Sequence, residues 1–121
     1  ILDCAAGDGI EPDCRFQNPE DLVASPAGGF ILVSQFGDME GHRPGSLVAL
    51  DPASGDIRPL YPEPRNEAPT PGWGDPDCGP PDTGRFAPHG IDLKRLDSRA
   101  DALYVVNHGG RESVEMFEVR E

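Results

Sequence analysis

The hydrophobic residues of this chain gather in short runs, and turn-forming residues separate the runs. Each run has roughly the five or six residues of an ordinary β-strand and is rich in β-branched or aromatic residues. No segment keeps apolar residues at the 3.6-residue spacing of a helix. The pattern therefore predicts an all-β chain with strands at 30–34, 46–50, 57–61, 102–106 and 113–119.

The first part of the chain resembles the last part. Residues 19–23 and the strand 30–34 match residues 88–92 and the strand 102–106, and the two prolines that open these segments are 69 residues apart. Removing roughly 25 loop residues leaves about 44, which is the repeat length of a β-propeller blade. The sequence therefore predicts a partial β-propeller domain over residues 1–121 with about two blades, or, as the alternative, a small β-sandwich. Since a closed ring needs about four blades or more, we expect the propeller to continue beyond Glu121.

A long loop separates the two similar parts. Residues 62–88 hold 8 prolines and 4 glycines, and the apolar runs lie outside this stretch. This distribution predicts a long insertion between short strands rather than a disordered chain. The loop contains Trp73, which either covers the mouth of an active site or anchors the loop.

The charge of the chain narrows the choice of partners. Acidic residues number 22 and basic residues 10, so the net charge is −12. This charge repels phosphate backbones and anionic lipids, which argues against binding to nucleic acids or membrane surfaces. No stretch approaches the roughly 18 apolar residues of a membrane span. The composition suits a solvated enzyme, or a cation-binding protein if carboxylates converge.

The chain has three cysteines, Cys4, Cys14 and Cys78, and no two of them form a C-x-x-C motif. An odd number leaves one cysteine either unpaired or paired outside these 121 residues. One disulfide and one free thiol is the simplest interpretation, and Cys4–Cys14 and Cys4–Cys78 are both possible bridges. Cys4 and Cys14 lie in a segment rich in Gly, Asp and Pro that a disulfide would order. We therefore expect a secreted or periplasmic protein.

Polar residues occupy the same point in the two similar parts. Glu20 and Asp21 follow Pro19, and His89 follows Pro88, in each case at the start of the strand that would line the central channel. On neighbouring blades these side chains would converge at one mouth of the channel. Carboxylate oxygens are ligands that calcium prefers. Taken singly, the acidic pair also fits a solvated turn, and His89 fits a structural histidine.

A second histidine, His108, ends an apolar strand and precedes two glycines. Two histidines that face one cavity allow one to act as a general base while the other orients it. No serine occurs in a G-x-S-x-G motif, and Cys78 has no base beside it in sequence. An activated water is therefore favoured over a covalent nucleophile. His42 lies in a loop between strands and is expected at the surface.

Three segments together resemble a known family. Asn-Pro-Glu-Asp-Leu at 18–22, Ala-Pro-His-Gly-Ile at 87–91 and Val-Val-Asn-His at 105–108 are similar to the N-terminal third of the paraoxonase/arylesterase family. The 19-residue spacing of His89 and His108 also agrees with the histidine pair of that family. Its members are six-bladed propeller lactonases and esterases with calcium in the central channel. The resemblance covers roughly residues 14–119.

The resemblance implies a role for each matching residue. Glu20 would bind a catalytic calcium ion that polarises the carbonyl group of an ester or lactone substrate. Asp21 would bind a second, structural calcium ion together with the backbone carbonyl of Ile91. His89 would be the general base for the hydrolytic water, with His108 as its partner. The remaining calcium ligands would lie on later blades.

Other features depart from the family. Cys14 is similar to a family cysteine that bridges to the far C-terminus, but Cys4 is additional, and the loop 62–88 is unusually long and rich in proline. The gluconolactonase-like and strictosidine-synthase-like propellers share the architecture and use other site residues. Two further alternatives are a non-catalytic, calcium-stabilised propeller that serves as a binding scaffold and a small disulfide-stabilised binding module complete in 121 residues.

Overall fold

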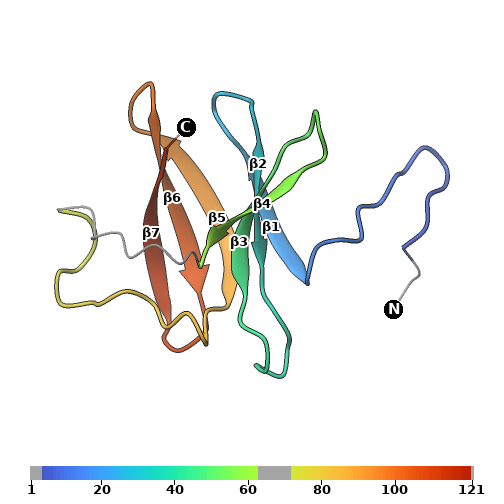
Figure 1. Ribbon diagram of the computed structural model, residues 1–121. Coiled ribbons are helices and arrows are strands. Elements are labelled where there is room, and N and C mark those ends of the chain that lie inside the picture. Colours follow the sequence, from blue (N-terminus) through green and yellow to red (C-terminus); the bar gives the residue numbers. More distant parts are fainter. Residues whose placement is uncertain (1–3, 63–71, 121) are drawn as a thin grey trace.

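The structure is a computed structural model that describes residues 4–62 and 72–120. Within these residues, seven β-strands form two antiparallel sheets (Figure 1). The first sheet contains β1 (Pro19–Ala24), β2 (Ile31–Gln35), β3 (Ser46–Leu50) and β4 (Ile57–Tyr61) in that order, and the second contains β5 (Pro88–Arg95), β6 (Ala100–Asn107) and β7 (Ser113–Arg120). The described part has no helix, and hence none long and apolar enough to cross a membrane. The predicted all-β class is confirmed.

The five apolar runs correspond to β2, β3, β4, β6 and β7, each within about two residues of its predicted bounds, as is normal for sequence-based boundaries. Neighbours in sequence are neighbours in each sheet because every connection inside a sheet joins adjacent antiparallel strands. β5 begins at Pro88, so the long loop ends one residue earlier than predicted. Residues 63–71 of this loop lie outside the described residues, and residues 72–87 contain neither helix nor strand.

The first strands of the two sheets share a backbone irregularity. In β1 the register with β2 shifts between Pro19 and Asp21, and in β5 the register with β6 shifts between Pro88 and Ile91. Proline has no N–H to donate to the ladder and is tolerated at the first residue of a strand or at a bulge. Glu20 and His89 therefore lie in bulges at equivalent points of the two sheets.

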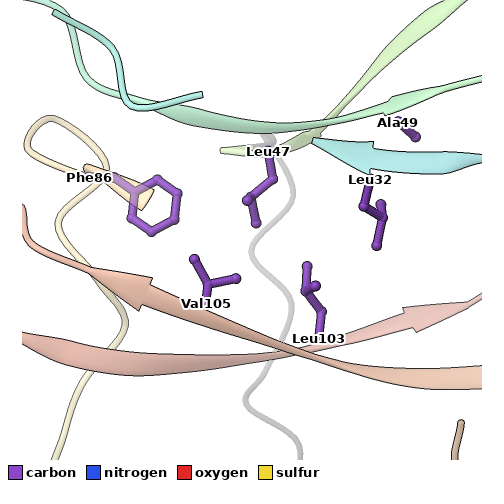
Figure 2. Close-up of a cluster of buried hydrophobic side chains, with 6 residues drawn as sticks. All are labelled: Leu32, Leu47, Ala49, Phe86, Leu103 and Val105. Atoms are coloured by element: carbon purple, nitrogen blue, oxygen red, sulfur yellow. The ribbon is translucent and has the colours of Figure 1, made fainter. Parts of the chain in front are cut away.

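The hydrophobic core lies between the facing sides of the two sheets (Figure 2). Its fully or almost fully buried members come from β2 and β3 on one side, from β6 on the other and from the loop before β5: Leu32, Leu47, Ala49, Leu103, Val105 and Phe86. Removing a large apolar side chain from water contributes about 1.5–3 kcal/mol. Phe86 fastens the end of the Pro/Gly-rich loop to this core.

The sheets approach one another through their first strands. β1 lies beside β5, and β2 also contacts β5 (Figure 1). Tight approach at this edge depends on Gly45, whose N–H donates to the carbonyl of Phe86 at 2.6 Å. A Cβ on Gly45 would collide with the side chain of Pro88 and with the backbone of Gln35. The strands that carry Glu20, Asp21 and His89 are therefore neighbours.

Each sheet also carries apolar side chains on the face turned away from the core. On the second sheet, Val106 pairs with Val114 across β6 and β7, and Tyr104 pairs with Met116. Val114 is 61% exposed, and Leu22 on the first sheet is 64% exposed. Scattered exposed apolar residues are common, but four in adjacent cross-strand pairs form a patch.

The N-terminal segment is closed by a disulfide between Cys4 and Cys14, whose Cα atoms are 6.0 Å apart. This distance is normal for a disulfide. Of the two open alternatives, Cys4–Cys14 is therefore the one formed, and Cys78 is a free, exposed thiol. The implied bridge from Cys14 to a distant cysteine is wrong, because the Sγ atom of Cys14 is already bonded to Cys4.

Candidate active site

The bulges at the start of β1 and β5 bring Glu20 and His89 together. The Oε2 atom of Glu20 lies 3.3 Å from the Nε2 atom of His89; the Glu20 side chain is half-buried and the His89 side chain is exposed. The structure thus places the first acidic residue of the predicted site against the predicted general base.

Asp21 connects the two sheets through backbone groups. Its Oδ2 atom accepts the N–H of Ile91 at 2.8 Å, and its Oδ1 atom accepts the N–H of Leu22 at 2.8 Å. Asp21 and Ile91 were predicted to share a calcium ion through the Ile91 carbonyl. They do lie together, but the contact in the structure uses the Ile91 N–H.

Ser34 is a site residue that the sequence analysis missed. It is fully buried on β2, and its hydroxyl donates to the carbonyl oxygen of His89 at 2.6 Å, with the carbonyl oxygen of Asp21 3.3 Å away. It therefore fixes the backbone of both bulges. The available signal was a serine at the end of an apolar run, because a buried hydroxyl needs a hydrogen-bond partner.

The ring of His89 contacts two further rings. His108 lies edge-on with a centroid distance of 5.3 Å and an interplanar angle of 79°, and Phe36 lies edge-on at 5.6 Å and 84°. Phe36 follows β2 directly, as His108 follows β6. The two are equivalent positions of the repeat, so extending the match two residues beyond the strands 30–34 and 102–106 would have identified Phe36.

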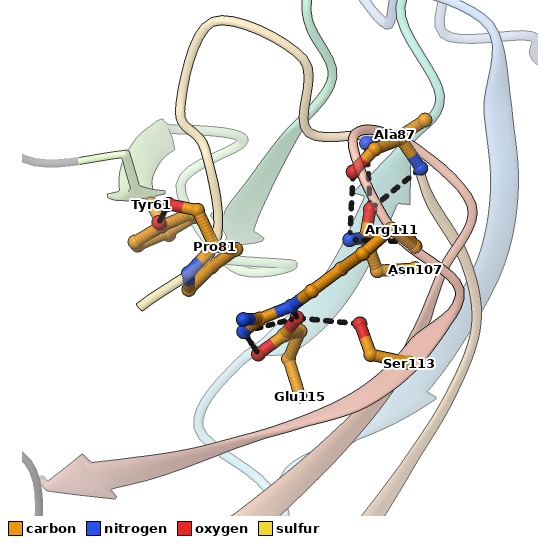
Figure 3. A network of polar contacts seen from close by, with 8 residues as sticks. Tyr61, Pro81, Ala87, Asn107, Arg111, Ser113 and Glu115 are labelled. Atoms are coloured by element: carbon orange, nitrogen blue, oxygen red, sulfur yellow. Dashed lines mark hydrogen bonds and ion pairs between the residues drawn. The ribbon is translucent and has the colours of Figure 1, made fainter. Parts of the chain in front are cut away.

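The loop that carries His108 is held by Asn107, which is fully buried (Figure 3). Its Oδ1 atom accepts the N–H groups of Ala87 and Gly109, each at 3.0 Å, and its Nδ2 atom donates to the carbonyl of Gly109 at 3.0 Å and of Arg111 at 3.3 Å. All polar atoms of this amide are thereby engaged. Asn107 therefore fixes the path of the backbone as it leaves β6, and with it the position of the His108 backbone.

The far end of the same loop is fixed by an ion pair. Arg111 donates to both carboxylate oxygens of Glu115 at 2.9 Å, and Ser113 donates to Glu115 at 2.6 Å (Figure 3). The Nδ1 atom of His108 lies 2.5 Å from Oε2 of Glu112, which is exposed. The imidazole of His108 is therefore oriented by a carboxylate on one side and faces His89 on the other.

A cleft of about 250 Å³ opens beside these rings. Its lining residues belong to the segments 36–44, 84–87 and 108–110, and they include Phe36 and His108. Trp73 is half-buried and, like Cys78, is not among the lining residues. His42 is exposed and lies 3.3 Å from Glu40, as expected for a surface residue.

The described residues supply only part of a calcium site. Glu20 and Asp21 are of the chemical type that calcium prefers, but no group of three or more His, Cys, Asp or Glu side chains within residues 4–62 and 72–120 is placed to hold a metal ion. Calcium takes six to eight oxygen ligands. The donor types fit the ion and their number does not complete its shell, so calcium binding stays a prediction.

No protein-family model, curated protein or solved structure matches this chain.

Proposed function

We propose that this chain forms the first two blades of a six-bladed β-propeller hydrolase that cleaves lactones or aryl esters with the help of calcium. The observation that supports this function best is the convergence of Glu20, Asp21, His89 and His108, from three different strands and loops, at one edge of the sheet pair. All four were predicted as site residues from sequence motifs. Such convergence of acidic and imidazole groups beside a cleft is typical of hydrolytic sites.

Two features favour a propeller over the alternative of a small β-sandwich. The first strand of each sheet begins with a proline that is followed by a bulge. These two strands lie side by side, as the inner strands of neighbouring blades would. In a two-layer sandwich the outward faces are polar. Here Leu22 on one outward face, and Val106 with Val114 on the other, are apolar and exposed, which suits further sheets on both sides.

The proposed mechanism uses His89 as the base. His89 removes a proton from a water molecule, and the water oxygen attacks the carbonyl carbon of the substrate. The bond from that carbon to the alcohol oxygen breaks, and the departing oxygen takes the proton back from His89. The carboxylate of Glu20, 3.3 Å from the imidazole, stabilises the cation that forms in between.

His108 is the partner that orients His89. Its ring edge limits rotation of the His89 ring from one side, as Phe36 does from the other. Glu20 and Asp21 would hold the calcium ions, one for each carboxylate. A calcium ion bound by Glu20 would supply a Lewis acid for the negative charge on the carbonyl oxygen.

A non-catalytic scaffold is the second candidate. It is favoured by the contacts of Asp21 and Ser34, which all go to backbone groups of the two bulges and would hold the sheets together without any reaction. The disulfide is compatible with a secreted or periplasmic location for either candidate, and this location stays a prediction.

Hydrolysis assays on the full-length protein separate the two candidates. With phenyl acetate and a γ-lactone as substrates, we expect turnover by the wild type and a loss on the order of 10²–10⁴-fold in kcat/KM for His89→Gln. The matched control is His42→Gln, since His42 is also exposed and also lies beside a glutamate, and it should retain full activity. A folded, calcium-saturated wild type that hydrolyses neither substrate would favour the scaffold.

A further inference from the structure

The cleft beside His108 contains two arginines whose charges are not neutralised by an ion pair. Arg43 and Arg85 both line it. Within the described residues, neither guanidinium group makes a hydrogen bond or salt bridge, whereas Arg15, Arg111 and Arg120 each pair with an acidic residue. In a chain with a net charge of −12, two unpaired arginines in one cleft form a local positive region.

The acidic residue of the cleft, Asp38, is engaged elsewhere. Its Oδ1 atom accepts the N–H of His42 at 2.7 Å, and its Oδ2 atom accepts the N–H of Arg43 at 2.9 Å. Burial raises the pKa of Asp38, but these N–H groups and the charge of His42 outweigh it, so the pKa is lower than usual. Asp38 is therefore an anion that stabilises its own loop, and it leaves the Arg43 guanidinium free.

The backbone around Arg85 is fixed close to His108. The N–H of His108 donates to the carbonyl of Ala87 at 3.1 Å, and the N–H of Arg85 donates to Asp82 at 3.1 Å. A Cβ on Gly109 would collide with the carbonyl of Arg85, so only glycine allows this approach. The positive wall of the cleft and the histidine are thus held by one rigid backbone contact.

The lining of the cleft also includes two accessible apolar side chains. Phe36 is half-buried and Met39 is 79% exposed, whereas the Phe86 side chain is fully buried in the core. Apolar side chains near two guanidinium groups suit an organic molecule with a hydrophobic body and an anionic end. Guanidinium groups bind carboxylates through paired N–H···O bonds.

We propose that this cleft binds the carboxylate of the substrate, so that the preferred substrates are esters or lactones that carry a carboxylate group. The inference rests on the proposed hydrolytic function and adds the substrate class to it. Arg43 and Arg85 bind the carboxylate, and Phe36 and Met39 contact the hydrophobic body. The reactive carbonyl then lies toward His108 and His89, because Phe36 and His108 border both the cleft and the His89 ring.

The test uses two esters of nearly the same shape, 4-acetoxybenzoate and its neutral amide 4-acetoxybenzamide, with the full-length protein. For the carboxylate ester we expect a lower KM in the wild type, a rise of about 3- to 10-fold in KM for Arg43→Gln or Arg85→Gln, and a larger rise in the double variant. The KM of the amide should not change. Arg99→Gln, in the exposed turn between β5 and β6, is the matched control and should behave as wild type.

Calorimetric titration with benzoate and benzamide separates this inference from the proposed function. Binding of benzoate in preference to benzamide, and its loss in the double variant, supports the inference even if neither ester is hydrolysed, an outcome that would contradict the hydrolase proposal alone. Equal binding of benzoate and benzamide, or benzoate binding that the double variant leaves unchanged, overturns the inference. That result would leave the hydrolase proposal standing if both esters are still turned over.

Discussion

Asp21 and Ile91 are 70 positions apart in sequence, yet the Oδ2 atom of Asp21 accepts the backbone N–H of Ile91 at 2.8 Å. Within the described residues, no ladder of backbone hydrogen bonds connects the two sheets. This side-chain hydrogen bond therefore contributes to holding the sheets together. It holds β1 and β5 at the distance that lets Glu20 meet His89. The geometry of the candidate site therefore depends on an acidic residue that is not itself the base.

Replacement of Asp21 by alanine should lower the free energy of unfolding by about 1 kcal/mol, because the N–H groups of Ile91 and Leu22 lose a charged acceptor. Asp21→Asn keeps one acceptor oxygen and should lose less. Urea denaturation of the full-length variants measures the change. Asp92→Ala, an exposed aspartate on β5, is the control, and an equal loss in this control would contradict the bridging role.

The substitution Ser34→Ala should lower the free energy of unfolding by more than the loss of one small side-chain atom suggests. The carbonyl oxygen of His89 would lose its hydroxyl donor in a fully buried place, and an unsatisfied buried group costs about 1–3 kcal/mol. Ser54→Ala, in the exposed turn between β3 and β4, should stay within about 0.5 kcal/mol of wild type. Thermal melts compare the stability of the two variants. If the Ser34 variant is as stable as the Ser54 variant, the Ser34 hydroxyl does not stabilise the fold.

His108→Gln should reduce kcat less than His89→Gln does, by under about 10²-fold, because His108 orients the proposed base and does not carry the proton itself. Steady-state kinetics with a lactone and an aryl ester check this order. Glu112→Gln removes the charged partner of His108 at 2.5 Å and should change kcat in the same direction with KM preserved. If the His108 variant is the slower of the two histidine variants, their roles must be exchanged.

Calcium removal should lower both the melting temperature and the hydrolytic rate of the full-length protein. An ion that binds only the folded state stabilises it by about 2.7 kcal/mol when its concentration is 100 times the Kd. Glu20→Gln should mainly lose activity, and Asp21→Ala should mainly lose the calcium-dependent rise in melting temperature. A chelator that changes neither the melting temperature nor the rate would show that these carboxylates bind no functional calcium.

Tyr61 makes stability depend on pH in the alkaline range. Burial, followed by the negative charge of Glu115, raises the pKa of Tyr61 above its usual 10.0 in the folded protein. Since folding favours the neutral phenol, this contribution to stability is complete below pH 10 and is lost as the pH rises through the raised pKa.

The matched variant is Tyr61→Phe, which keeps the ring between Phe86 and Phe117, each at a centroid distance of 4.9 Å. Between pH 10 and 12 the melting temperature of the wild type should fall more steeply than that of the variant. Parallel curves would mean that the phenol ionises in the folded protein as readily as in the unfolded chain.

The strands could be predicted because their signals are local. Runs such as 30–34 and 102–106 are apolar and β-prone, and turn residues bound them on both sides. The equivalence of Glu20 with His89 was also predictable, since the two prolines mark the same point of the repeat. The structure adds that this point is a bulge in both strands, which a pattern of residue types does not reveal.

The contacts that the sequence analysis missed are all contacts between distant segments. Phe86 lies in a segment rich in proline and glycine, and only the packing of both sheets around it makes it a core residue. Ser34 and Asn107 are polar residues whose burial depends on neighbours many residues away. The choice between Cys14 and Cys78 as the disulfide partner of Cys4 also depends on distance in space, which the sequence does not give.

The paired bulges have one further consequence. Because a register shift follows the opening proline of both β1 and β5, the side chain after each proline lies at the corresponding point of its sheet. The first sheet has the carboxylate of Glu20 at this point, and the second sheet has the imidazole of His89. Phe36 and His108, which follow the next strand of each sheet, also occupy equivalent positions with different chemistry. The repeat thus provides a common backbone position at which different side chains can be placed. A new chemistry at this position requires a change of side chain and no change of backbone.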